Sequence, residues 1–210
     1  IGMEWTEIIV AFISAAATIT CTLLGKFAID RRKAAKKDPI MQDVENNENI
    51  EICLSYILDQ VGADRAYVMQ FHNGGYYISG KSQQKFSCSH EISSPGTSRE
   101  CHDSQNHLIS NYHNYIGNIM TNQEYCYEDT EDIEDHAFKN VIMTKGVLSI
   151  YNIPLKTLEG KIIGILGIDF VKRQASPIYK FSKDTEECKC HEDMNQFMRR
   201  QARILSAYLI

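Results

Sequence analysis

The stretch SIYNIPLKTLEGKIIGILGIDF, residues 149–170, decides the fold of this chain. It carries most of two apolar runs, Val147 to Leu155 and Lys161 to Phe170. Such runs are typical of strands, and Leu158-Glu159-Gly160 between them has the short, glycine-containing form of a hairpin turn. The stretch therefore predicts a pair of antiparallel strands.

Further strands are expected upstream of this pair. Arg65 to Phe71 alternates like a strand, and the Asn73-Gly74 dipeptide after it favours a tight turn. Phe86 to Ile92 is the expected return strand, and Tyr125 to Tyr127 is a further short one. We therefore expect an early hairpin that closes at Asn73-Gly74.

Helices are expected around these strands. Apolar residues recur at helical spacing in segments that run from about Ile40 to Gly62, Leu108 to Met120, Ile133 to Thr144 and Met194 to Tyr208. Helices and strands in this order predict the α+β fold class, with an antiparallel sheet flanked by helices.

The late strand pair carries a resemblance to a known family. GAF domains commonly have an apolar strand that ends in a Pro-Leu pair, a short turn with glycine, and a strand of the form Ile-Gly-Ile/Val-Leu. The matching residues here are Pro154-Leu155, Gly160 and Ile163-Gly164-Ile165-Leu166. The chain from about Glu48 to Phe170 therefore resembles a GAF domain. We expect the glycines of the second strand to let the first helix lie close to the sheet.

This resemblance implies a sensing or docking module, since GAF domains bind small molecules over one face of their sheet. It does not imply one ligand. In the bilin-binding branch a Cys-His pair leads the helix before the late strands, whereas this chain has Asp135-His136 there and its Cys101-His102 lies too early. The sequence also lacks the ionic motif of the cyclic-nucleotide-binding branch. No nucleophile or metal motif of an enzyme accompanies the fold, so we expect a non-enzymatic protein.

The uncharged segment IIVAFISAAATITCTLLG, from Ile8 to Gly25, is long enough to cross a bilayer. It lacks the basic leader of a secretory signal, which favours a retained transmembrane helix over a cleaved one. The alternative is an amphipathic helix buried in the protein. The basic residues after this segment are Lys26, Arg31, Arg32, Lys33, Lys36 and Lys37. Because positive flanks resist translocation, we expect a single-pass protein of the inner membrane with a cytoplasmic C-terminal domain.

These features divide the chain into a transmembrane anchor at 1–30, a basic juxtamembrane linker and helix start at 31–47, and a GAF-like domain with its C-terminal helix at 48–210. Small and hydroxyl residues form one stripe of the predicted anchor: Ala11, Ser14, Ala15, Thr18, Thr22 and Gly25. Such a stripe lets two spans approach closely, which favours a homo-oligomer. The other interpretation is that short spans often contain small residues.

A second resemblance belongs to a different functional class. The single-span holins of T-even-type phages combine one N-terminal span with a soluble mixed α/β domain that receives an antiholin. The closing QARILSAYLI is similar to their C-terminal helix. Their soluble domain lies outside the inner membrane, whereas the basic flank here predicts the opposite side. A holin-like lysis protein is therefore the alternative to a sensing module that acts on an unidentified protein partner.

Two groups of residues are candidate sites. His72, Asn73, Tyr76 and Tyr77 have the aromatic and polar character of a pocket rim; the alternative is that Asn-Gly makes a turn and the tyrosines cover the sheet. Cys88, Cys101, Cys188 and Cys190 offer thiolates, which zinc prefers. Their spacing matches no zinc ribbon, so a cysteine-rich loop or redox-labile thiols is the alternative.

The bulk composition argues against some further functional classes. The formal net charge is -5, which argues against nucleic acid as a partner because phosphate binding needs clustered cations. The one basic cluster follows the predicted anchor and is suited to anionic lipid. The 7 cysteines have no regular spacing, which favours reduced thiols over a disulfide framework.

Overall fold

The computed structural model describes residues 9–10, 18–27, 38–172 and 189–210. It divides into two units, Ile1–Glu45 and Asn46–Ile210. In the first unit, residues 18–27 are helical and helix α2 (Pro39–Val61) begins. None of the helices in the described ranges combines the length and the apolar character that a bilayer crossing needs. Part of the predicted anchor, residues 11–17, lies outside those ranges, so the anchor stays a prediction without structural support.

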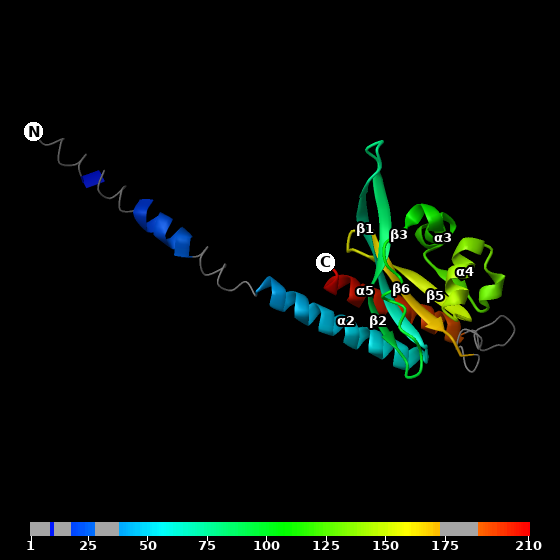
Figure 1. The fold of residues 1–210 in the computed structure, drawn as a ribbon. Helices are drawn as coiled ribbons and strands as arrows, with labels where there is room; N and C mark the ends of the chain where they lie inside the picture. Colours follow the sequence, from blue (N-terminus) through cyan, green and yellow to red (C-terminus); the bar gives the residue numbers. More distant parts are fainter. Residues whose placement is uncertain (1–8, 11–17, 28–37, 173–188) are drawn as a thin grey trace, which may run out of the picture. The chain divides into compact units, whose positions relative to one another are not determined.

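The second unit is built on one six-stranded sheet with the order β3-β2-β1-β6-β5-β4 (Figure 1). Every neighbouring pair in it is antiparallel. The strands are β1 (Arg65–Tyr76), β2 (Ser82–Ser93), β3 (His107–Leu108), β4 (Tyr125–Tyr127), β5 (Ser149–Lys156) and β6 (Ile162–Phe170). The predicted late pair is β5 and β6, and its turn places Gly160 at φ +85°. The predicted antiparallel sheet is confirmed.

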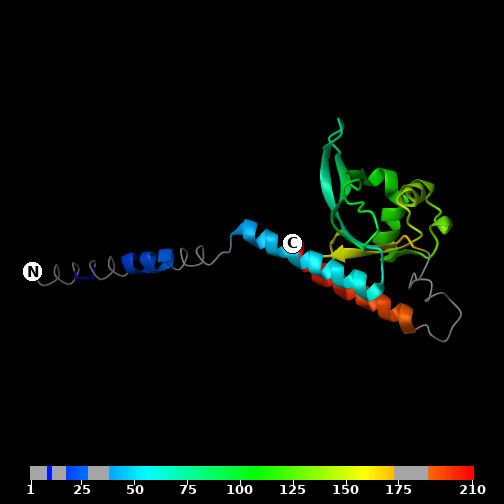
Figure 2. The ribbon, with the colours of Figure 1, turned by 60° about the horizontal axis from the view of Figure 1, so that its bottom comes forward.

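Helices cover both faces of this sheet (Figures 1 and 2). On one face lie α2 and the closing helix α5 (Lys189–Tyr208), which run side by side. On the other lie α3 (His113–Asn122) and α4 (His136–Thr144), with the short 3-10 helices η1 (Ile109–Tyr112) and η2 (Thr130–Asp132). The fold therefore has three layers, with the sheet between two layers of helices, and the central strands β1 and β6 are covered on both faces.

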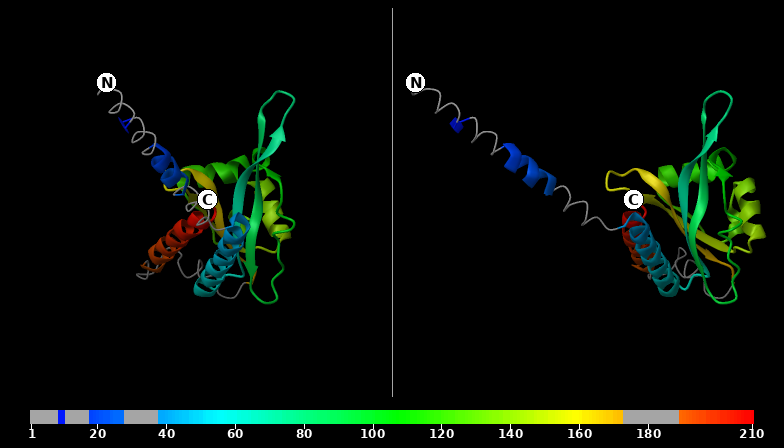
Figure 3. Two further views of the ribbon diagram at one scale, coloured as in Figure 1. Left: turned by 90° about the vertical axis from the view of Figure 1, so that its left-hand side faces the viewer. Right: turned by 60° about the vertical axis from the view of Figure 1, so that its left-hand side comes forward.

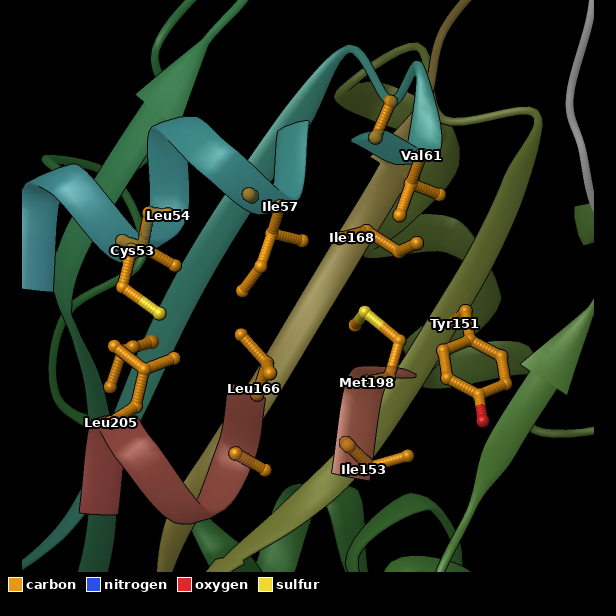
Figure 4. Packing of buried hydrophobic residues seen from close by; sticks show 14 of the residues in the cluster. Cys53, Leu54, Ile57, Val61, Tyr151, Ile153, Leu166, Ile168, Met198 and Leu205 are labelled. Carbon is orange, nitrogen blue, oxygen red and sulfur yellow. The ribbon is translucent and has the colours of Figure 1, made fainter. Parts of the chain in front are cut away.

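Strand alternation sends side chains to a separate core on each face. On the α2 and α5 side, Val68, Leu166 and Ile168 meet helix residues that include Leu54, Ile57, Met198 and Leu205 (Figure 4). On the α3 and α4 side, Ile150 and Ile165 meet Ile119 and Phe138. Because successive strand residues point to opposite faces and both faces are covered, β5 and β6 are buried along almost their whole length. This explains why they dominate the sequence signal.

Local details differ from the sequence expectations. The early hairpin does not close at Asn73-Gly74, because β1 continues to Tyr76 and the turn lies at 77–81, where Tyr77 N donates to Lys81 O at 2.9 Å. The expected helix from Leu108 is the 3-10 helix η1 followed by α3, whereas the one expected from Ile133 begins only at His136, after η2 has ended at Asp132. The glycines of β6 also serve another purpose than the one expected. The nearest atoms to a Cβ at Gly164 or Gly167 belong to β1 and β5, not to α2.

Candidate functional site

A cavity of about 60 Å³ lies between the sheet and the α3 and α4 layer. Its walls come from β1, β2, β5 and β6, from the loop after β2, and from η1, α3 and α4. The lining residues that matter below are Arg65, Tyr67, Phe86, Cys88, Glu91, Ser104, His107, Tyr112, Tyr115, Phe138, Lys145 and Asp169. One part of this lining is aromatic and another part is charged.

The aromatic part is a set of rings held against one another. Tyr115 of α3 stacks on Phe138 of α4 with ring centroids 3.9 Å apart. Tyr112 meets Phe138 edge-on at 6.3 Å and Phe86 of β2 edge-on at 5.6 Å. These contacts fix the rings of four elements by packing, so this wall is preformed for an apolar group.

The charged part centres on Arg65, which is 2% exposed, and Asp169, which is 5% exposed. Both residues face each other in the pairing of β1 with β6, and Arg65 Nη1 lies 3.5 Å from Asp169 Oδ2. Arg65 Nη2 donates to Lys145 O, at the C-terminal end of α4, at 2.5 Å. Arg65 Nε has no hydrogen-bond partner in the described part of the chain. A buried donor without a partner is costly and calls for an acceptor.

The environment of Asp169 balances two opposing effects. Burial raises the pKa of its carboxyl to about 6, although the Arg65 charge and the hydrogen bond from Tyr67 both lower it. Tyr67 Oη donates to Asp169 Oδ1 at 3.0 Å and lies 2.9 Å from Asn152 Oδ1, while Asn152 Nδ2 donates to Tyr115 Oη at 2.8 Å. Burial raises the pKa of both tyrosines well above the usual value, so their hydroxyls are neutral. This network joins the charged and aromatic parts of the wall.

A third part of the wall carries the thiol of Cys88, and Cys101 lies beside it. Cys88 Sγ, Cys101 Sγ and a carboxylate oxygen of Glu91 all lie within 4.8 Å of one another. Glu91 is held in place because the backbone N–H of Glu100 donates to its two oxygens at 2.9 and 3.0 Å. Lys145 Nζ donates to Ser104 Oγ nearby. Burial, and then the Lys145 charge, lower the pKa of His107 below its usual value, so its ring is neutral at pH 7.

The predicted ligand residues lie elsewhere. His72, Asn73, Tyr76 and Tyr77 stand on the outer half of the β1–β2 hairpin, which projects beyond the helices (Figure 3), and none of them lines the cavity. Tyr76 and Tyr77 are 71% and 42% exposed. His72 Nε2 is 2.8 Å from Ser87 Oγ, and Asn73 Oδ1 accepts from Gln84 at 3.1 Å. These residues therefore lie apart from the cavity, and their role in ligand binding stays a prediction.

The predicted metal residues are partly brought together. Cys88 and Cys101 are neighbours, and Glu91, which was not among the predicted metal residues, joins them. Cys188 lies outside the described residues; Cys190 lies in α5, but its side chain is not described. Of the predicted anchor stripe, Ala11, Ser14 and Ala15 lie outside the described ranges. Thr18, Thr22 and Gly25 lie on the helical residues 18–27, where the Thr22 hydroxyl donates to Thr18 O.

Comparison with known proteins tests the fold. No family model and no curated protein matches the chain. Among solved structures, GAF3 from Slr1393 of Synechocystis matches with a TM-score of 0.55 and 11% identity, covering 78% of this chain and 92% of that one. The PixJ GAF domain of Thermosynechococcus elongatus matches with a TM-score of 0.54 and 12% identity, over 79% and 88%.

A GAF domain region from Geobacter sulfurreducens matches with a TM-score of 0.54 and 12% identity, covering 82% of this chain and 98% of that one. The resemblance that was carried by Pro154-Leu155 and the glycine-containing β6 is thereby confirmed at the level of fold. Asp135, which precedes His136 in the sequence, caps α4 by accepting from the backbone N–H of Ala137 and Phe138. The body of this chain has the fold of a GAF domain.

Proposed function

We propose that this chain is a non-enzymatic sensing module that binds a small molecule in the cavity beneath α3 and α4. The observation that carries the proposal is Arg65 Nε, a buried donor without a partner among the described residues, on the wall of a cavity that also has an aromatic part. A cavity whose apolar wall faces a few fixed polar groups is the usual form of a small-molecule site. A bound acceptor at Arg65 would remove the cost of the unpaired donor.

The size of the cavity limits the ligand. An engineered cavity of about 150 Å³ holds benzene, whereas this one measures about 60 Å³. It therefore suits a molecule of only a few heavy atoms. Such a ligand would place an oxygen acceptor at Arg65 Nε and Lys145 Nζ, and a short apolar body against Phe138 and Tyr112. A short-chain carboxylate or its amide has this form.

The sheet provides a route from the cavity to the opposite helices. In β1, Arg65 and Tyr67 line the cavity while Ala66 and Val68 pack in the core shared with α2 and α5. In β6, Asp169 lines the cavity while Ile168 packs in that same core. A ligand that favours one position of these strands would therefore favour one packing of α2 against α5. The mechanism is a shift between populations, which a protein partner would detect.

Ligand binding is tested by thermal unfolding. We expect acetate, propionate, acetamide or propionamide to raise the melting temperature of the chain with saturation, at constant ionic strength. Ligand at a hundredfold excess over Kd adds about 2.7 kcal/mol to the free energy of unfolding. Arg65→Lys keeps the charge but removes the Nε–H, so it should lose most of this rise. Tyr76→Ala, on the exposed hairpin, is the matched control and should keep it. Equal rises in Arg65→Lys and the native chain would exclude this site.

The membrane location also belongs to this proposal. It is supported by the uncharged segment at 8–25 and by the cations that follow it from Lys26 to Lys37. The proposed protein is a homo-oligomer in the inner membrane, with its domain in the cytoplasm and its basic linker at anionic lipid.

Topology is tested with a reporter at the C-terminus. We expect alkaline phosphatase fused there to be inactive and green fluorescent protein to be fluorescent, with the chain in the membrane fraction. Removing residues 1–30 should move the protein to the soluble fraction. An active phosphatase fusion would place the domain outside and favour the holin alternative, which no observation in the structure favours.

A further inference from the structure

The sheet contains an irregularity that builds a site of its own. Along the pairing of β1 with β2, Val68 faces His90 and Met69 faces Cys88, so Ser89 has no facing residue on β1. Ser89 is therefore the extra residue of a β-bulge. In a regular strand, residues three apart point to opposite faces. When one of the residues between them is the extra residue of a bulge, they point to the same face. Cys88 and Glu91 consequently both line the cavity, and both are buried.

The loop after β2 adds the third group. It is held to the bulge by two hydrogen bonds, because Cys88 N donates to Ser104 O and Gln105 Nε2 donates to Cys88 O, both at 2.7 Å. Gln105 Nε2 also donates to Cys101 O within the loop, at 2.7 Å. Cys101 Sγ approaches Cys88 O at 3.4 Å. The same loop donates the Glu100 N–H to both oxygens of Glu91. The bulge and the loop thus bring two thiols and an oriented carboxylate together.

We propose that Cys88, Glu91 and Cys101 bind one zinc ion, with its fourth coordination position directed to the cavity. Zinc takes thiolate sulfur at about 2.3 Å, so two sulfurs on one ion are at most about 4.6 Å apart. The three ligand atoms already lie within 4.8 Å of one another, close to this limit. The inference goes beyond ligand sensing and holds whether or not the cavity takes an organic molecule.

The surroundings of these residues support a cation. The Glu100 N–H orients Glu91, as outer hydrogen bonds orient carboxylates that bind metals. The charged side chains on the cavity wall are two cations, Arg65 and Lys145, and three carboxylates, Glu91, Glu100 and Asp169. The wall is therefore negative before either thiol ionises. Cys88 and Cys101 are both free thiols, so neither is committed to a disulfide.

The experiment uses the full chain in detergent, purified with a phosphine reductant and stripped with a chelator. Zinc is titrated against a chromogenic competitor, and cobalt is added in parallel to record its d–d and thiolate charge-transfer bands. We expect one tight zinc per chain and a cobalt spectrum typical of tetrahedral thiolate coordination. Cys101→Ser and Glu91→Gln should each weaken zinc binding by roughly 100-fold, since both remove a direct ligand and even outer-shell changes cost about 10- to 100-fold.

Matched variants separate this site from other thiols. Cys126→Ser, on β4 and half-buried against the opposite core, should leave zinc affinity unchanged. Cys188→Ser with Cys190→Ser removes the other predicted cysteines and should also leave it unchanged. Cys101 is only half-buried, so its variant tests the site without opening a core, and circular dichroism confirms folding. Loss of zinc in the Cys188/Cys190 variant, or its retention in both Cys101→Ser and Glu91→Gln, would overturn the proposal.

Discussion

Gly167→Ala is expected to lower the free energy of unfolding by about 3 kcal/mol, at the upper end of what overpacking costs. A Cβ at this position would lie closer than 3.0 Å to Asn152 Oδ1 and to two ring atoms of Tyr67. Neither side chain is free to move, because Tyr67, Asn152, Asp169 and Tyr115 are joined by hydrogen bonds. The substitution therefore either strains β6 or breaks a buried polar network.

Urea unfolding followed by circular dichroism measures this loss, and Gly117→Ala is its control. Gly117 lies on the exposed face of α3, where a Cβ would meet nothing within 4 Å. Alanine exceeds glycine in helix stability by about 1 kcal/mol, so this variant should be stabilised. If Gly167→Ala unfolded within about 1 kcal/mol of the native chain, the close packing described around Tyr67 would be wrong.

The parts of the fold that the sequence predicted are those with a local signal. β5 and β6 are mostly apolar and are joined by a turn in which Gly160 takes a positive φ. The helix from about Ile40 to Gly62 corresponds to α2, because its apolar residues recur at helical spacing and Gly62 adopts a positive φ just after it. In both cases the residues that make the element are neighbours in sequence.

The early hairpin shows where a local signal fails. Asn73-Gly74 has the composition of a tight turn, yet Asn73 faces Gln84 within the strand pairing. The reversal is made further out, where Gly80 adopts φ +79°. Long-range pairing of β1 with β2 fixes this register, and a dipeptide preference is too weak to override it.

The candidate site was predicted least completely, for a related reason. Cys88 and Cys101 were identifiable by residue type, but Glu91 joins them only because the bulge at Ser89 turns it to the same face. Arg65 and Asp169 are 104 residues apart and meet through the pairing of β1 with β6. A signal for them was present, since each is a charged residue beside an apolar part of its strand.

Arg65→Met is expected to have the largest effect of all, a loss of about 3 to 5 kcal/mol at pH 8, because it leaves Asp169 buried without a counter-charge. It also removes the hydrogen bond to Lys145 O, which ties the end of α4 to β1. Lys172→Met is the control, since the Lys172 side chain is 53% exposed where it pairs with Asp64, whose carboxylate also accepts from the backbone N–H of Val171 and Lys172. Loss of this exposed ammonium should cost less than about 1 kcal/mol.

The loss in Arg65→Met should depend on pH in a direction that identifies its cause. The folded pKa of Asp169 is raised from 3.8 to about 6, so the folded state holds this proton more tightly than the unfolded state does. The contribution of Asp169 to the free energy of unfolding is therefore fully present below about pH 4 and is lost as the pH rises through 6. The total loss is roughly 3 kcal/mol, at about 1.4 kcal/mol per pKa unit. Without Arg65, which lowers this pKa, the window extends to higher pH. The variant should consequently lose less stability at pH 5 than at pH 8, relative to the native chain.

Asp169→Asn in the Arg65→Met background separates charge from packing. Asparagine keeps the side-chain shape and an acceptor for the Tyr67 hydroxyl, but it carries no charge and does not titrate. The double variant should recover much of the stability lost at pH 8. Its free energy of unfolding should differ from that of the Asp169→Asn single variant by the same amount at pH 5 and at pH 8. A loss that is equal at pH 5 and pH 8, and that Asp169→Asn does not reduce, would mean that Arg65 acts through its contact with Lys145 O and not through the buried charge pair.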